Sequence, residues 1–211
     1  MAVALLALYG LFILLTVGIR AAIQLRRTGS PGVNAFRAET GSAEWVAGML
    51  FIIGVFTAPL APLLDLLGVL GPIPALDTAT VNLIGLAIGV IGTFVVFLAQ
   101  LAMGDSWQIG VKEEDSPELV TSGIFGIVRN PIYAVTFPTL VGFALMVPSV
   151  LALINMTVVI LALELQVRFI EEPYLQRHHA RAFAAYAARV GRFFPGIGLI
   201  KAPAGAPAVD A

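Results

Sequence analysis

The chain has no cysteine among its 211 residues and only two histidines, His178 and His179. The absence of cysteine excludes disulfide bonds, thiolate metal sites and a cysteine nucleophile. Adjacent residues on a helix point about 100° apart, so the two histidines form a poor chelating pair. No second cluster of ligand residues completes a site around them. The sequence therefore predicts no metal centre.

The sequence also lacks the short motifs of soluble nucleotide-binding and hydrolytic enzymes. It contains no Walker loop, no G-x-S-x-G elbow and no H-E-x-x-H pair, and no G-x-G-x-x-G follows a strand. These absences exclude the soluble nucleotide-binding folds, and no nucleic-acid partner is expected.

Charge is scarce as well, at 12% of residues, whereas 59% are hydrophobic. A mean hydropathy of +0.95 is far above that of a soluble domain. A helix rises about 1.5 Å per residue, so a run of about 20 apolar residues crosses a hydrocarbon core of about 30 Å. The sequence predicts an all-α integral membrane protein with five transmembrane helices, in the apolar runs 2–19, 44–64, 79–103, 131–147 and 149–167.

The last two runs are separated by Pro148 and Ser149. A continuous helix across that proline is disfavoured, so residues 131–167 are expected to form a helical hairpin. The alternative is a re-entrant hairpin that enters the membrane and returns without crossing it. Both arrangements leave the two ends of the hairpin on the same side.

Basic residues are absent from one side of the membrane in this five-span arrangement. All 12 follow the first, third or fifth span, and the segment 65–78 has none. The positive-inside rule then places the N-terminus outside the inner (plasma) membrane and the C-terminus in the cytoplasm. No basic residue precedes the first apolar run, which favours a retained helix over a cleaved signal peptide. The basic residues are Arg20, Arg26, Arg27, Arg37, Lys112, Arg129, Arg168, Arg177, Arg181, Arg189, Arg192 and Lys201.

The chain divides into three parts. Residues 1–103 hold three transmembrane helices, and residues 197–211, rich in alanine and proline, form a tail predicted to be disordered. Between them, residues 104–196 comprise a polar connector, the hairpin and a C-terminal cytoplasmic helical segment. The hairpin makes neighbours of the polar stretches 104–130 and 164–195, so a pocket between them is the predicted site.

A helix is expected to begin at Pro131, which suits the first turn, with Asn130 as its cap. The unpaired N–H groups of such a terminus can bind a carboxylate. Arg129, just before it, is either a second anchor for a ligand or a determinant of topology.

Four charged residues follow the hairpin at helical spacing: Glu164, Arg168, Glu171 and Glu172. On a helix they share one face, where Arg168 can pair with a glutamate. The set is either a surface salt-bridge ladder or a receptor for a cationic or hydroxyl-bearing ligand.

The ordered combination of these motifs resembles the isoprenylcysteine carboxyl methyltransferase and phospholipid methyltransferase superfamily, whose members are integral membrane enzymes. The resemblance covers roughly residues 105–196. It is carried by the segments 119–125 and 128–133, and then by Arg168, Glu171, Glu172, Leu175, Phe183, Tyr186, Val190, Arg192 and Pro195. Asn130 stands where the family usually has histidine, and Phe125 where many members have tyrosine.

The resemblance implies an S-adenosylmethionine-dependent methyltransferase in a lipid bilayer, acting on a lipophilic acceptor, for which an isoprenoid is preferred. It implies that Arg168 and Arg189 approach the substrate. Glu171 would bind a polar part of the cofactor, and the rest of the cofactor site would be lined by Leu119, Val120, Phe125, Asn130, Pro131, Ile132 and Tyr133. The alternatives are a membrane reductase of the sterol reductase type that uses NADPH, and a membrane scaffold without enzymatic activity.

Overall fold

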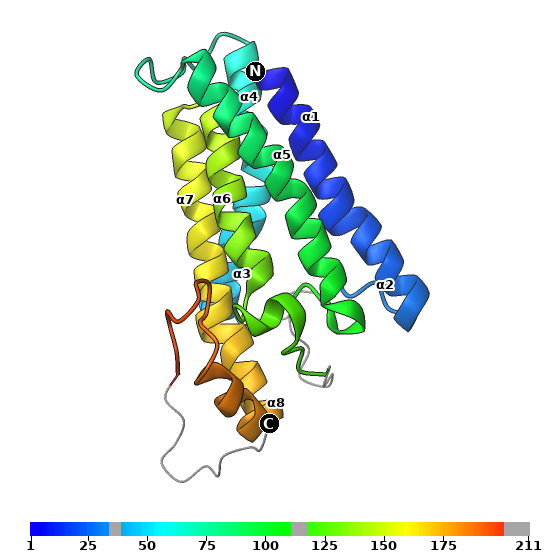
Figure 1. Cartoon of the computed structure of the whole chain (residues 1–211). Helices are drawn as coiled ribbons and strands as arrows, with labels where there is room; N and C mark the ends of the chain where they lie inside the picture. The colour runs from blue at the N-terminus through cyan, green and yellow to red at the C-terminus, as the bar shows by residue number, and fades with distance from the viewer. Residues whose placement is uncertain (34–38, 111–117, 201–211) are drawn as a thin grey trace.

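The computed structural model describes residues 1–33, 39–110 and 118–200 (Figure 1). Regular structure in these residues is helical, and no β-strand occurs among them. Three of the basic residues used above, Arg37, Lys112 and Lys201, lie outside the described residues, as does most of the tail predicted to be disordered. The elements are α1 (Ala2–Ile13), η1 (Leu14–Ile19), α2 (Arg20–Thr28), α3 (Ala43–Thr57), α4 (Leu60–Leu66), α5 (Ala79–Ala102), η2 (Gly104–Ser106), η3 (Gly123–Gly126), α6 (Pro131–Met146), α7 (Val150–Leu165), η4 (Gln166–Glu171) and α8 (Glu172–Ala187).

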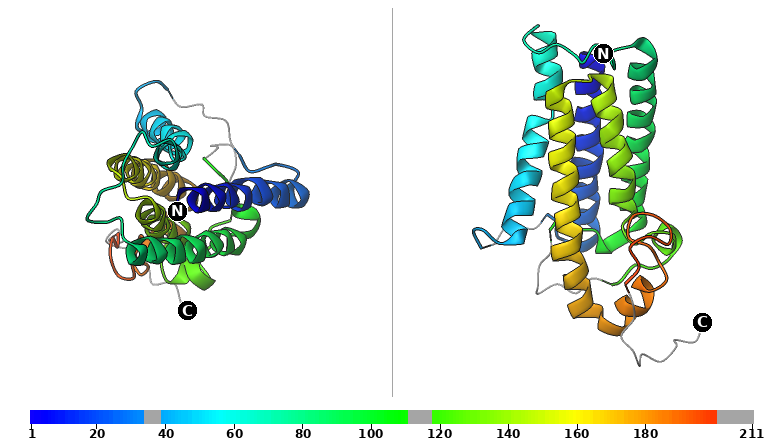
Figure 2. Two further views of the ribbon diagram at one scale, coloured as in Figure 1. Left: turned by 90° about the horizontal axis from the view of Figure 1, so that it is seen from above. Right: turned by 90° about the vertical axis from the view of Figure 1, so that its left-hand side faces the viewer.

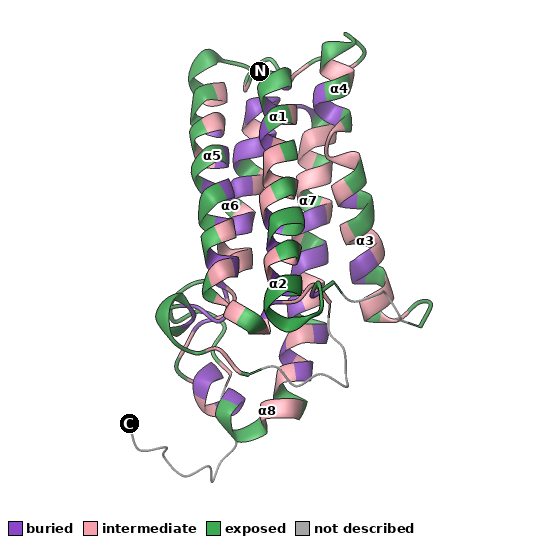
Figure 3. Ribbon diagram, turned by 90° about the vertical axis from the view of Figure 1, so that its right-hand side faces the viewer, coloured by how far each residue is buried: buried purple, intermediate pink, exposed green. Residues whose placement is uncertain are grey.

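The helices form one elongated bundle (Figure 2). Within the described residues, four helical stretches are long and apolar enough to cross a membrane: Ala2–Thr28, Ala43–Leu66, Ala79–Ala102 and Val150–Ala187. The fifth predicted span, 131–147, corresponds to the shorter apolar helix α6 of 16 residues. The helical membrane architecture is thus confirmed, while the number of crossings stays a prediction. Exposed residues occupy the outer faces of the helices, and buried residues occupy the faces turned toward neighbouring helices (Figure 3).

The predicted hairpin is formed by α6 and α7. The chain turns at residues 147–149, and the side chain of Ser149 caps α7 by accepting a 3.2 Å hydrogen bond from the Ala152 amide. The two helices lie side by side in opposite directions (Figure 1). Pro131 and Glu171 therefore come to the same end of the bundle.

Glycines bring α5 and α6 into close contact. A Cβ atom on Gly142 of α6 would lie 2.7 Å from the backbone nitrogen of Gly89 in α5, and one on Gly92 would lie 2.1 Å from Thr139 Oγ1. Small residues allow helix backbones to approach this closely in membranes, where van der Waals packing drives association. The glycines of α5 thus serve packing within the chain and allow the close approach of α6.

Asn155 joins α7 to α3. Its side-chain amide donates 2.8 Å hydrogen bonds to the carbonyl oxygen of Gly54 and to Thr57 Oγ1. A polar group within a span needs such an interhelical partner, because lipid offers none. Asn155 is therefore a packing residue between α7 and α3.

We expect Gly142→Ala to destabilise the bundle by about 1–3 kcal/mol, the usual cost of overpacking a filled interface. The added methyl group meets backbone atoms of α5, which cannot rotate away. Thermal unfolding in detergent measures the effect. Gly10→Ala is the matched control, because a Cβ atom there meets nothing within 4 Å. Equal unfolding temperatures for the two variants would contradict the packing argument.

Candidate functional site

A pocket lies at the end of the bundle where α6 begins. Its walls are the connector after α5, the segment around residues 118–125, the first turn of α6, and the region from Glu171 into α8. It is lined by Met103, Ser106, Gln108, Gly110, Glu118, Leu119, Val120, Phe125, Arg129, Asn130, Pro131, Ile132, Tyr133, Glu171, Glu172, Tyr174, Leu175, Phe183 and Tyr186. This is the place between the two polar stretches where the hairpin topology predicted a site.

All eight residues proposed from the sequence to bind the cofactor line this pocket: Leu119, Val120, Phe125, Asn130, Pro131, Ile132, Tyr133 and Glu171. The two arginines proposed to approach the substrate do not. Arg168 pairs with Glu164 and lines a neighbouring hollow that shares Glu172 and Phe183 with the pocket. Arg189 is exposed and donates a 3.3 Å hydrogen bond to the carbonyl of Ala185. The roles of Arg168 and Arg189 stay predictions.

The N-terminus of α6 forms part of the wall. Pro131 occupies the first turn, as predicted, and Asn130 occupies the cap position. However, the Asn130 side chain makes no capping bond, so the predicted cap is wrong in its chemistry. Its amide nitrogen Nδ2 instead donates to the carbonyl of Arg192 at 3.3 Å, because the C-terminal segment lies against the helix start.

Glu171 closes the pocket across from α6. The Tyr133 hydroxyl donates a 2.5 Å hydrogen bond to Glu171 Oε1, which connects the first turn of α6 to the end of η4. The helix that begins at Val150 continues to a kink at Ala180. These roughly 30 residues span about 45 Å at 1.5 Å per residue, so the charged part of the helix lies beyond the roughly 30 Å membrane core. Burial raises the pKa of Glu171, against the opposing effect of hydrogen bonds from Tyr133 and Gln166.

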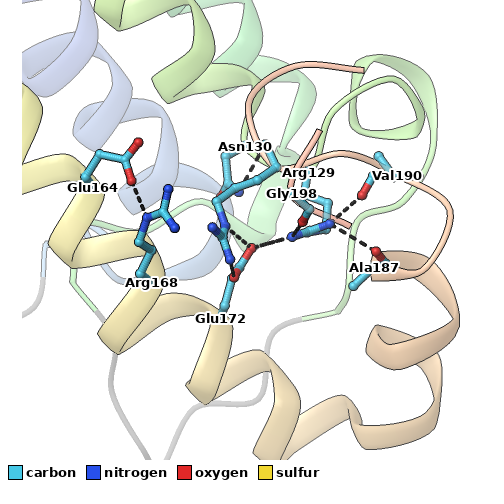
Figure 4. A network of polar contacts seen from close by, with 9 residues as sticks. Arg129, Asn130, Glu164, Arg168, Glu172, Ala187, Val190 and Gly198 are labelled. Atoms are coloured by element: carbon cyan, nitrogen blue, oxygen red, sulfur yellow. Dashed lines mark hydrogen bonds and ion pairs between the residues drawn. The ribbon is translucent and has the colours of Figure 1, made fainter. Parts of the chain in front are cut away.

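Glu172, the next residue, is held by two arginines (Figure 4). Arg129 Nη2 lies 2.7 Å from Oε1, and Arg192 Nη2 lies 2.6 Å from Oε2. Burial alone would raise the pKa of Glu172, but the hydrogen bonds from Arg192 and Arg129 outweigh it and keep the pKa below its ordinary value. Glu172 is therefore a buried, ionised partner of the protein's own cations, and Glu171 is the glutamate that remains for a ligand.

Arg129 fastens the C-terminal segment 187–198 to this site. Its five N–H donors are all engaged: Nε and Nη2 bind Glu172, while Nη1 and Nη2 also bind the carbonyls of Ala187, Val190 and Gly198. A guanidinium has no further donor. The sequence left two roles open for Arg129. It cannot act as an anchor for a ligand without breaking this network.

Apolar side chains cover the pocket on the α8 side. Phe183 and Tyr186 form a buried cluster against which Leu119, Leu175 and Val190 pack. The Tyr186 hydroxyl donates a 2.6 Å hydrogen bond to the Phe125 carbonyl, which joins α8 to the wall. The C-terminal segment that was expected to be helical thus turns apolar side chains toward the pocket.

The sequence did not predict that Met103, Ser106 and Gln108, at the connector, line the pocket. Nothing in their residue types marks a site, and their place directly after the third span was the available signal. Tyr174 was missed for a different reason, since an aromatic residue at helical spacing is typical of any buried helix face.

We expect Glu172→Gln to destabilise the fold by about 3–5 kcal/mol, because it leaves the buried Arg129 and the partly buried Arg192 without this counter-ion. Glu164→Gln, the same change in the exposed pair with Arg168, should cost about 0–1 kcal/mol. Thermal unfolding in detergent and limited proteolysis of residues 188–200 measure both.

The difference in stability between wild type and Glu172→Gln is expected to depend on pH. The pKa of Glu172 is depressed in the folded state below its ordinary value of 4.5, so its contribution to stability is present above that pH. The stability advantage of wild type over Glu172→Gln should shrink as pH falls through the depressed folded pKa. An advantage that is constant down to complete acid unfolding would contradict the assigned charge state.

Comparison with known proteins agrees with the motif resemblance. The family model described as phospholipid methyltransferase matches residues 81–182, which run from α5 into α8 and include all eight proposed cofactor-binding residues. No curated protein and no solved structure matches the chain. The family match does not favour the NADPH-dependent reductase alternative. The resemblance to the membrane methyltransferase superfamily of the phospholipid methyltransferases and isoprenylcysteine carboxyl methyltransferases is thus confirmed for residues 81–182.

Proposed function

We propose that this membrane methyltransferase uses S-adenosylmethionine, bound in the pocket at the start of α6, and methylates a lipophilic acceptor. The observation that carries the proposal is the convergence of the eight residues that the family resemblance implies on one pocket, between a helix N-terminus and Glu171. An isoprenoid is the preferred acceptor class. The nucleophile can be a carboxylate, thiol, amine or hydroxyl.

The donor set of the pocket fits this cofactor. Backbone N–H groups in the first turn of α6 suit a carboxylate, and the side chain of Glu171 suits an ammonium group or ribose hydroxyls. Leu119, Val120 and Phe125 supply apolar surface beside these polar groups. The pocket thus offers polar contacts at one wall and an apolar lining at another, as an amphipathic nucleoside requires.

Bound there, the cofactor supplies a methyl group activated by a sulfonium. Displacement at such a carbon needs alignment of the reactants and exclusion of water, so the protein needs no covalent nucleophile. The buried Phe183 and Tyr186 side chains keep water from the α8 side of the pocket. The Tyr133–Glu171 hydrogen bond keeps the two walls at a fixed separation.

The acceptor is proposed to enter from the bilayer at its cytoplasmic face. The pocket lies where α6 and α7 meet the polar segments, at the end of the bundle that also carries the last turn of α2 (Figure 1). The described arginines gather at this end, which supports a cytoplasmic pocket by the positive-inside rule.

Calorimetry with S-adenosylhomocysteine and with NADPH on the purified protein tests the cofactor. We expect saturable one-site binding of S-adenosylhomocysteine and no binding of NADPH. The reverse result would replace the methyltransferase proposal with the reductase one, and binding of neither would favour the scaffold.

Glu171→Gln should weaken S-adenosylhomocysteine binding by about 10- to 150-fold, the equivalent of a lost hydrogen bond to a charged group of about 1.5–3 kcal/mol. The fold should survive, because Glu171 is absent from the Arg129–Glu172–Arg192 network. Glu164→Gln is the control, since Glu164 lies on the same continuous helix but does not line the pocket. Wild-type affinity in Glu171→Gln would remove Glu171 from the site.

Incubation with methyl-labelled S-adenosylmethionine and a lipid extract identifies the acceptor. We expect the label in an organic-soluble product that the Glu171→Gln variant does not form. Label found only in water-soluble products would contradict a lipophilic acceptor.

A further inference from the structure

Arg20 is a buried cation far from the family region. It begins α2, and only 1% of its surface is exposed. Its guanidinium donates to the Gln100 carbonyl at 3.3 Å, to Gln24 Oε1 at 2.9 Å and to the Gly104 carbonyl at 2.5 Å. It also lies 4.5 Å from the centre of a Trp107 ring.

The hydrogen-bond partners of Arg20 are neutral, which is unusual for a buried charge. The Asp105 carboxylate, which pairs with Arg27 at 2.7 Å, also acts electrostatically on Arg20. Two of the hydrogen-bond partners, the carbonyls of Gln100 and Gly104, belong to the last turn of α5 and the residues just after it. Carbonyl groups at a helix C-terminus carry partial negative charge and favour a cation. The Trp107 ring face adds a cation–π contact. Arg20, at the start of α2, therefore caps the C-terminal end of α5.

Neighbours of Arg20 bind the same connector. Gln24 Nε2 donates to the Asp105 carbonyl at 2.6 Å, and the Ile109 amide donates to the Gly32 carbonyl at 2.7 Å. Gly32 has a positive φ of 67°, and a Cβ atom there would lie 3.0 Å from the Trp107 carbonyl. Segment 20–33 thus contacts the connector 100–109 along the length of the connector.

That connector is a wall of the pocket. Met103, Ser106 and Gln108 line it, and Ser106 Oγ donates a 3.1 Å hydrogen bond to the Glu118 carbonyl. Glu118 directly precedes the lining residues Leu119 and Val120. A shift of the connector would therefore move two walls of the pocket together.

We propose that Arg20 is a positioning residue for the pocket: through the end of α5 and Trp107 it sets the place of the connector wall, and so the affinity for the cofactor. The affinity part rests on the proposed function. The placement of the connector can be tested without any ligand.

The ligand arm compares Arg20→Met, Arg20→Lys and the control Arg26→Met by calorimetry with S-adenosylhomocysteine. Arg26 lies on the same helix but is exposed. We expect Arg20→Met to raise Kd by about tenfold, as expected for a lost hydrogen-bonded anchor of about 1.4 kcal/mol. Arg20→Lys should recover part of the affinity, because an ammonium can still reach one carbonyl, and Arg26→Met should bind as wild type. A folded Arg20→Met protein with wild-type Kd overturns the proposal.

The ligand-free arm uses Trp107 emission in a Trp45→Phe background, which leaves Trp107 as the one tryptophan of the chain. Trp107 is buried, so release of the connector should shift its emission to longer wavelength in Arg20→Met and not in Arg26→Met. An unchanged emission overturns the proposal. If wild type does not bind S-adenosylhomocysteine, the proposed function fails, and this arm still decides the role of Arg20.

Should Arg20→Met not fold, Gln24→Ala replaces it in both arms. This variant removes the 2.6 Å bond to the Asp105 carbonyl and one acceptor of Arg20 while keeping the cation. A smaller rise in Kd with the same direction of emission shift supports the proposal, and wild-type values in both overturn it.

Discussion

The pocket depends on one buried carboxylate. Glu172 lies between Arg129, which precedes α6, and Arg192, in the C-terminal segment, with 6% of its surface exposed. Removing a carboxylate from water is expensive, and the cost is offset only when both partners are in place with good geometry. Three segments far apart in the sequence are therefore held in a single arrangement, since displacing any of them leaves a buried charge unpaired.

This network separates the functions of two adjacent glutamates. Glu172 is neutralised by the protein itself, whereas Glu171, about 100° around the helix, lines the pocket with a hydrogen bond from Tyr133. Glu171 is the last residue of a π-helical stretch, Gln166–Glu171, of the kind that often occurs at functional sites. The Arg129–Glu172–Arg192 network thus fixes the position of Glu171 and leaves the Glu171 carboxylate out of its ion pairs.

Much of the fold and site could be predicted because the signals are local. Apolar runs of membrane length marked the helices, and the Pro148–Ser149 break marked the hairpin. The family resemblance, itself carried by short motifs, implied eight residues that line one pocket. Contacts between side chains and distant backbone carbonyls leave no such trace. Arg129 makes its five bonds, and Asn130 bonds to the Arg192 carbonyl and does not cap α6, because residues 187–198 fold back against the start of α6. No periodicity in the sequence encodes that return.

The family region therefore does not contain everything that shapes its own pocket. Arg192 and Gly198 lie after the matched residues 81–182, and Arg20 and Gln24 lie before them, yet all four hold elements that line the pocket. A membrane hairpin alone fixes only the two helix ends. The loops between those ends need anchors. Arg20 and Gln24 bind backbone carbonyls of the connector, while the C-terminal segment offers the Gly198 carbonyl to Arg129 and the Arg192 side chain to Glu172. Such anchors constrain geometry without demanding particular residues in the loops, which explains why the connector shows so little of its role in its own sequence.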